Sequence, residues 1–177
     1  KDYSAFIILD VTQMPFKIVA MFRNNEIRPL LFPHTIDQVC KAFNHAHVLV
    51  ETNDLGQQIA EALQFELEYD NLLMTTQRGR AGQILGAGFS GRGSGFGVKM
   101  TKQIKKIGCA NIKTLIESDK ILINDFNIIE EMSTFIRKGQ SWQADDGNTD
   151  DLMMCLVIFG WLSNQPFFKE MTDTNAR

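Results

Sequence analysis

The chain of 177 residues lacks the features that mark several protein classes. No apolar run approaches the ~18 to 20 residues that a membrane-spanning helix needs. The three cysteines, Cys40, Cys109 and Cys155, lie far apart without a CxxC pair, which excludes a disulfide scaffold and a cysteine-rich zinc site. The absence of a GxxxxGK[ST] motif predicts that this chain does not hydrolyse ATP. What remains is a globular composition, with 44% apolar and 22% charged residues.

Acidic residues are also missing from one stretch of the chain. Residues 71–116 contain no Asp or Glu, and they carry eight basic residues. Since the whole chain has a net charge of −3, the other residues together carry −11. This asymmetry suits a polyanion held by the basic segment and an acidic, metal-binding centre elsewhere, although a solvated basic loop is the alternative. The basic residues are Arg78, Arg80, Arg92, Lys99, Lys102, Lys105, Lys106 and Lys113.

Apolar segments of two kinds alternate along the chain, which predicts an α/β fold with a parallel or mixed sheet. Short β-branched or aromatic runs predict strands, the first two joined as a hairpin, at 5–9, 15–22, 47–50, 72–74 and 121–123. Helical spacing predicts helices at 36–45, 54–67, 128–137 and 152–162. We expect Thr35 to cap the first helix and Asn53 or Asp54 to cap the second. The last helix is apolar all round, so we expect it to be buried.

Glycine is concentrated in residues 77–97, which hold eight of the thirteen glycines and three arginines. We expect no core there, and we interpret the segment as a long flexible loop or a ragged hairpin that contacts nucleic acid. Residues 86–91 match GxGxxG, but further glycines follow where a dinucleotide site needs a helix. Residues 164–177 are interpreted as a tail. We expect one domain over residues 1–177.

Carboxylates at two places predict metal chemistry. Glu51 follows a strand that should be central, at the sheet edge where ligands bind in open α/β folds, although an exposed loop carboxylate is the alternative. Four aspartates fall within 145–151, and Asp150 and Asp151 begin the buried helix. The helix dipole accounts for one of them, but four repel one another unless a divalent cation is bound. Carboxylates without His or Cys favour Mg²⁺ or Mn²⁺, and two such ions can promote phosphodiester hydrolysis.

Several motifs carry a resemblance over nearly the whole chain. They are Asp2-Tyr3, residues 8–12, the sequence Glu51-Thr52-Asn53-Asp54-Leu55-Gly56, Gly108-Cys109 with residues 115–117, and residues 147–152 running into 156–162. Together they resemble the C-terminal nuclease domain of the large terminase subunit, the DNA-packaging motor of tailed bacteriophages, especially of the T-even type. The resemblance implies an RNase H-like α/β fold, a mixed central sheet of about five or more strands flanked by helices.

The resemblance also implies three acidic residues that hold two Mg²⁺ or Mn²⁺ ions. Glu51 matches the second acid and Asp151 the third, with Asp150 beside it as a ligand or a supporting group. The first acid belongs to a motif like D-x-S-x-G-x-G-x-D-Y, so we expect it a few residues before Lys1. Asp10 is a weaker substitute, because it lies beyond that motif.

The activity implied is that of an endonuclease that cuts concatemeric double-stranded DNA when packaging starts and when it is complete. The implied partners are DNA, an N-terminal ATPase domain of the same protein, the portal protein and the small terminase subunit, with no membrane. The implied location is the host cytoplasm, at the procapsid portal. The alternatives are another RNase H-like enzyme (a transposase, integrase or resolvase) and a non-catalytic DNA-binding module. The residues expected to hold the DNA backbone are Arg78, Arg80, Arg92, Lys99, Lys102, Lys105 and Lys106.

Overall fold

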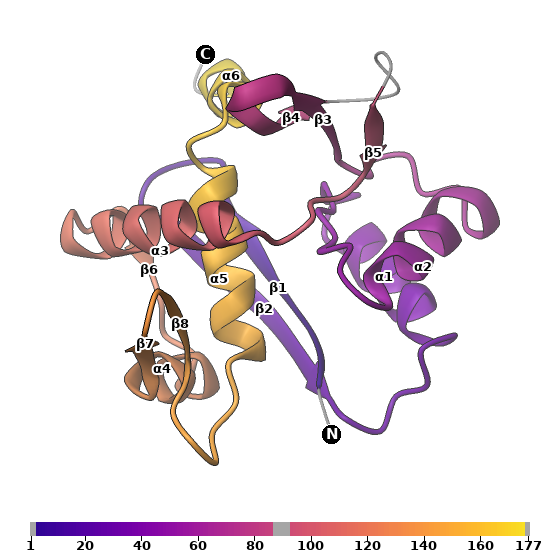
Figure 1. The fold of residues 1–177 in the computed structure, drawn as a ribbon. Helices are drawn as coiled ribbons and strands as arrows, with labels where there is room; N and C mark the ends of the chain where they lie inside the picture. The colour runs from indigo at the N-terminus through magenta and orange to yellow at the C-terminus, as the bar shows by residue number, and fades with distance from the viewer. Residues whose placement is uncertain (1–2, 87–92, 176–177) are drawn as a thin grey trace. The chain divides into compact units, whose positions relative to one another are not determined.

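The structure, a computed structural model, describes residues 3–86 and 93–175, and they fall into two compact units. The first unit comprises Lys1–Glu26 and Thr101–Arg177, and the second comprises Ile27–Met100. Both units combine helices with small sheets, as Figure 1 shows. The predicted α/β class is therefore confirmed.

The sheet of the first unit is mixed. Strand β1 (Ser4–Asp10) pairs antiparallel with β2 (Phe16–Asn24), which pairs parallel with the short strand β6 (Ile121–Leu122). The predicted hairpin and the predicted strand near residue 121 are confirmed. Within the described residues this sheet has three strands, fewer than expected.

Two helices of the first unit cross at a pair of glycines. Helix α3 (Lys102–Glu117) passes α5 (Asp151–Leu162) so closely that a Cβ on Gly108 would lie 2.1 Å from the Val157 carbonyl oxygen. A Cβ on Gly160 would lie 2.3 Å from the Gly108 carbonyl oxygen. The glycines therefore let the two backbones touch, and the predicted burial of α5 is confirmed.

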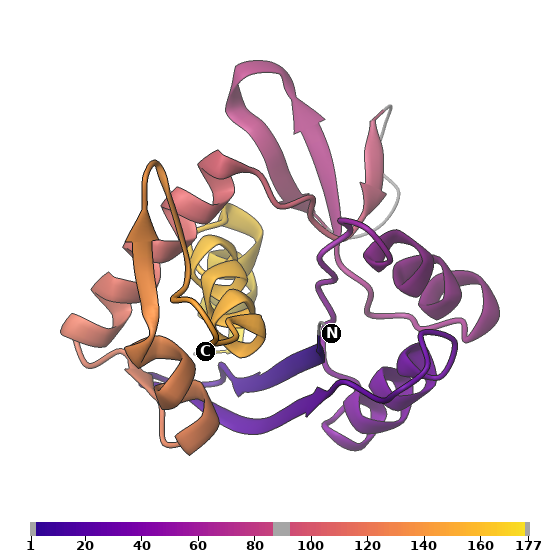
Figure 2. The same ribbon diagram turned by 60° about the horizontal axis from the view of Figure 1, so that its bottom comes forward.

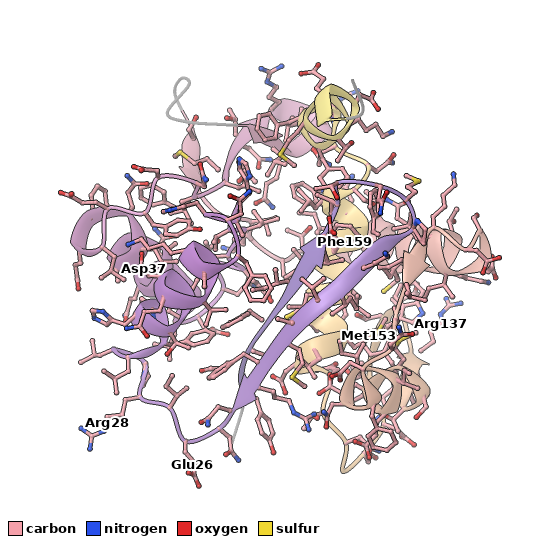
Figure 3. The ribbon with its side chains drawn as sticks, turned by 180° about the vertical axis from the view of Figure 1, so that it is seen from behind. Glu26, Arg28, Asp37, Arg137, Met153 and Phe159 are labelled. Atoms are coloured by element: carbon pink, nitrogen blue, oxygen red, sulfur yellow. The ribbon has the colours of Figure 1, made fainter. Side chains whose placement is uncertain are left out.

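Aromatic side chains join the last helix to the core. Residues 166–175, interpreted from the sequence as a tail, form helix α6 (Pro166–Asn175). The ring of Phe168, which is buried, meets the rings of Phe16 and Phe159 edge to face at centroid distances of 5.8 Å. The tail prediction was wrong because this apolar contact holds the segment against the unit. Figure 3 marks Phe159 on α5.

A hairpin replaces the end of a predicted helix. Helix α4 (Phe126–Ser133) begins at the N-cap Asp125 and stops at Ser133. Strands β7 (Phe135–Lys138) and β8 (Ser141–Ala144) follow as an antiparallel pair, which stands beside α3 in Figure 2. The prediction of a helix to residue 137 was wrong because pairing with β8 outweighs the local helical spacing.

The helices of the second unit begin differently from the prediction. Helix α1 (Phe32–Ala42) starts before Thr35, with Pro33 in its first turn, where the missing proline N–H leaves no helical bond unmade. Helix α2 (Gly56–Glu61) continues as a π-helical turn (Ala62–Glu66). Neither α1 nor α2 has a side-chain cap, so the predicted N-caps were wrong.

The glycine-rich segment of the second unit forms a small sheet. Strands β3 (Met74–Arg78), β4 (Gly82–Gly86) and β5 (Ser94–Phe96) pair antiparallel in the order β4-β3-β5, with a 3₁₀ turn (Gly79–Ala81) between the first two. The ragged hairpin is confirmed, but the expectation of no core was wrong, because Leu85 is buried. Arg92 and most of the GxGxxG match lie outside the described residues.

Candidate metal and DNA-binding site

Glu51 lies at the end of an extended segment in the second unit. The predicted strand at 47–50 is represented by two isolated parallel bridges, Val48 to Leu72 and Glu51 to Val98. The Val98 N–H donates to the Val50 carbonyl at 2.8 Å, and the Thr52 N–H donates to the Val98 carbonyl at 2.9 Å. Backbone bonds on both sides of Glu51 therefore fix the position from which its half-buried side chain projects.

Two glycines make room for the backbone around Glu51. A Cβ on Gly56 would lie 1.7 Å from the Glu51 carbonyl oxygen. A Cβ on Gly97, whose φ is +64°, would lie 2.1 Å from the Val50 carbonyl oxygen. Any side chain at either position would push the backbone of Glu51 out of place. The glycine of the E-x-N-x-x-G motif thus has a structural reason.

Two side-chain amides hold the segment that follows Val98. The Asn53 Oδ1 accepts from the Met100 N–H at 2.7 Å, and its Nδ2 donates to the Met100 carbonyl at 3.3 Å. Gln83 on β4 makes the same pair of bonds with Lys99, both at 2.8 Å. Asn53, predicted as a helix cap, therefore ties residues 99–100 to the Glu51 segment instead.

Asp150 and Asp151 lie at the start of α5 in the first unit. Asp151 is the first residue of the helix, and Asp150 is its N-cap. The Asp150 side chain does not bond to its own helix; its Oδ2 accepts from the Ala144 N–H of β8 at 3.0 Å. Both side chains are half-buried. The prediction that these residues begin a buried helix is confirmed.

A buried carboxylate beside these aspartates was missed by sequence reasoning. Glu131 on α4 is 2% exposed and forms an ion pair with Arg23 at 2.7 Å. It also accepts from the Thr149 hydroxyl at 3.0 Å and from the Met153 N–H of α5 at 2.9 Å. The sequence signal was slight: an acid at an expected buried helix position.

The predicted DNA-binding residues divide between the two units. Arg78, Arg80 and Lys99 are exposed in the second unit, and Lys102 and Lys106 are exposed on α3 in the first. Lys105 is half-buried, with its Nζ 5.7 Å from the centroid of the Phe135 ring. Arg92 lies outside the described residues. Binding of DNA by these residues stays a prediction.

Further basic side chains lie on the unpredicted β7–β8 hairpin. The Arg137 guanidinium stacks over the Trp142 ring at 5.9 Å. The Lys138 Nζ bonds to an Asp146 carboxylate oxygen at 2.5 Å, which raises the pKa of Lys138 and lowers that of Asp146. One cation of this hairpin is thus paired with a carboxylate of the 145–151 cluster, which reduces the repulsion within that cluster.

The family model for the terminase RNaseH-like domain matches residues 1–157. The chain belongs to this family. The match spans both Glu51 and Asp151, and it confirms the RNase H-like fold class. In this RNase H-like domain, no helix of the described residues is long and apolar enough to cross a membrane.

The donor atoms of the candidate site fit a hard divalent cation. Glu51, Asp150 and Asp151 offer carboxylate oxygens, which Mg²⁺ and Mn²⁺ prefer. Within the parts of the chain that the structure describes, no three His, Cys, Asp or Glu side chains are gathered closely enough to hold an ion. Glu51 belongs to the second unit and the two aspartates belong to the first. Their joint binding of metal stays a prediction.

The cysteine on α3 is unsuited to nucleophilic chemistry. Nearby lysines favour the Cys109 thiolate, but burial dominates and raises the pKa of this thiol. Cys109 packs against the apolar core of the first unit. Its interpretation as a packing residue agrees with this environment.

Proposed function

We propose that this domain is the nuclease domain of a large terminase subunit, of the T-even phage type, and that it cuts concatemeric double-stranded DNA at the start and at the completion of packaging. The observation that carries the proposal is the family match, which spans both predicted metal-binding acids. The acidic helix start and the basic, carboxylate-free segment 71–116 support it.

In this proposal, Glu51 and Asp151 hold Mg²⁺ or Mn²⁺, and Asp150 assists as a ligand or by fixing the helix start. When bound, a pair of these ions lowers the pKa of an attacking water and stabilises the leaving oxygen of a phosphodiester. The backbone bonds around Glu51 and the helix start at Asp151 restrict the two carboxylates before metal binds. Such preorganisation lowers the cost of ordering the site.

DNA binding in this proposal depends on phosphate contacts. The proposed contacts carry little information about base sequence, so we expect weak sequence preference. The proposed partners are an N-terminal ATPase domain of the same protein, the portal protein and the small terminase subunit, at the procapsid portal in the host cytoplasm. These partners rest on the resemblance of the motifs. The basic residues proposed to contact phosphates are Arg78, Arg80, Arg92, Lys99, Lys102, Lys105 and Lys106.

The test is a cleavage assay with the full-length protein on linear, supercoiled and four-way DNA, with and without Mg²⁺ or Mn²⁺. We expect Glu51→Gln and Asp151→Asn each to abolish metal-dependent cleavage. Glu117→Gln is the matched control, because Glu117 is an exposed glutamate paired only with Lys113 on the surface of α3. Cleavage that survives both substitutions would refute the catalytic proposal. Exclusive cutting of four-way DNA would identify a resolvase instead.

A further inference from the structure

The environment of Glu131 is unusual for a residue outside the proposed metal site. Its carboxylate is buried, and both oxygens accept hydrogen bonds. Oε1 accepts from the Arg23 guanidinium at 2.7 Å and from the Thr149 hydroxyl at 3.0 Å. Oε2 accepts from the Met153 backbone N–H at 2.9 Å. A buried charge is tolerated only when it is paired in this way.

The bond to Met153 takes the place of a helix cap. The first N–H groups of a helix have no partner in the helix itself. In α5 the first bond back along the helix comes from the Met154 N–H to the Asp150 carbonyl, so the Met153 N–H needs an outside acceptor. Asp150 does not supply one, because its side chain bonds to Ala144. Glu131, from α4, supplies it, and its negative charge also suits the positive end of α5.

Three elements therefore meet at the first turn of α5. Glu131 of α4 holds Met153, which Figure 3 marks on α5, while β8 holds Asp150. Strand β2 contributes Arg23, whose guanidinium also lies 5.0 Å from the centroid of the Tyr3 ring. Asp151 lies between the two held positions of this turn.

We propose that Glu131 is a positioning residue for Asp151. Glu131, kept in place by Arg23 and Thr149, fixes the first turn of α5 so that the Asp151 carboxylate is held ready for a divalent cation. The inference rests on the proposed function, since it assigns Glu131 to the same metal site. It adds a residue that neither the motifs nor the family match singles out.

The test compares two substitutions at opposite ends of α5. Glu131→Gln keeps the shape but leaves a single acceptor oxygen for donors on both sides of the group. Asn111→Ala is the matched control, because the Asn111 Nδ2 donates to the Gly160 carbonyl at 2.9 Å, in the last turn of the same helix. Thr149→Val is a milder second variant, which removes one donor to Glu131 without changing the side-chain shape.

The measurements are Mn²⁺ binding to the full-length protein, amide exchange at residues 151–154, and the Mn²⁺ concentration at half-maximal cleavage. We expect Glu131→Gln to weaken Mn²⁺ binding about tenfold to a hundredfold, the range seen when a partner of a metal ligand is lost, with excess Mn²⁺ restoring cleavage. Amide exchange in the first turn of α5 should accelerate, and Thr149→Val should shift both readouts less. Asn111→Ala should lower thermal stability without changing Mn²⁺ binding.

Two results would overturn the inference in distinguishable ways. If Glu131→Gln and Thr149→Val both bind Mn²⁺ like the unchanged protein while Asp151→Asn does not, Glu131 has a structural role only and the proposed function stands. If the unchanged protein binds no Mn²⁺, or if Asp151→Asn binds it normally, the proposed function fails and the positioning role fails with it.

Discussion

The crossing of α3 and α5 at Gly108 allows a prediction whose sign separates two physical effects. In a helix, alanine is favoured over glycine by about 1 kcal/mol, so helix propensity alone predicts that Gly108→Ala stabilises the protein. The new Cβ, however, would lie 2.1 Å from the Val157 carbonyl oxygen and 2.8 Å from the Val157 Cγ1, where ordinary contact begins near 3.4 Å. The nearest atom is backbone, so no change of rotamer relieves the clash.

The two helices must therefore move apart by more than an ångström at their closest point, along a buried contact. Overpacking of a core costs roughly 1 to 3 kcal/mol, and a backbone clash belongs at the upper end of that range. After the gain in helix propensity, we expect Gly108→Ala to lower the free energy of unfolding by about 2 kcal/mol.

The assay is urea unfolding followed by tryptophan fluorescence, because Trp161 is buried on α5 and reports on this helix. Ala110→Gly, at an exposed position of the same helix, is the control. It should lower the free energy of unfolding by about 1 kcal/mol through helix propensity alone. A Gly108→Ala variant as stable as the unchanged protein, or more stable, would refute the close crossing of α3 and α5.

Two further predictions concern pH and salt. Burial, with help from the nearby Asp37 carboxylate, raises the pKa of the Cys40 thiol from 9.0 to about 11, so the unfolded chain releases this proton first as the pH rises. Stability from this group is complete below pH 9.0, and about 2 kcal/mol should be lost between pH 9.0 and about 11; urea unfolding should show that Cys40→Ala removes this loss, and an unchanged alkaline loss would contradict the assignment. Replacing the three arginines of the glycine-rich segment by alanine should make DNA binding weaker and less salt-dependent, by up to about 0.9 in the log–log slope for each phosphate contact, whereas Lys169→Ala on α6 should leave the slope unchanged. An unchanged slope in the triple variant would remove the segment from the DNA interface; its residues are Arg78, Arg80 and Arg92.

Local pattern was sufficient to predict several elements of the fold. The β1–β2 hairpin follows from β-branched and aromatic runs on both sides of a short turn. Helix α5 follows from its continuous apolar sequence, and the structure buries it as predicted. These elements could be predicted because their own residues determine both their conformation and their burial.

Other elements depend on contacts between distant residues, which a local pattern does not contain. Helix α6 is held by Phe168 against Phe16 and Phe159, and one aromatic residue in a polar segment gives little warning of that contact. The β7–β8 hairpin depends on cross-strand pairing after a helix-like start. Thr35 was expected as a cap, but Pro33 is accommodated in the first turn of α1 and moves the helix start earlier.

The candidate site shows the same division. Glu51 and Asp151 were predicted from their places at a strand end and a helix start, and the structure confirms those places. The support around them was not predictable. The bond from Asn53 to Met100 joins residues 47 positions apart, and the bond from Glu131 to Met153 joins two helices. Such bonds depend on packing that only the folded chain supplies.

The most direct test of the central claim asks whether Glu51 and Asp151 bind one metal centre. Fe²⁺ replaces Mg²⁺ in the full-length protein, and ascorbate with peroxide then generates hydroxyl radicals that cut the backbone close to the bound ion. The account predicts cuts near residue 51 and near residue 151 together, both suppressed by excess Mg²⁺ and both lost in Asp151→Asn. Cuts near only one of the two residues, or cuts that persist in Asp151→Asn, would contradict it.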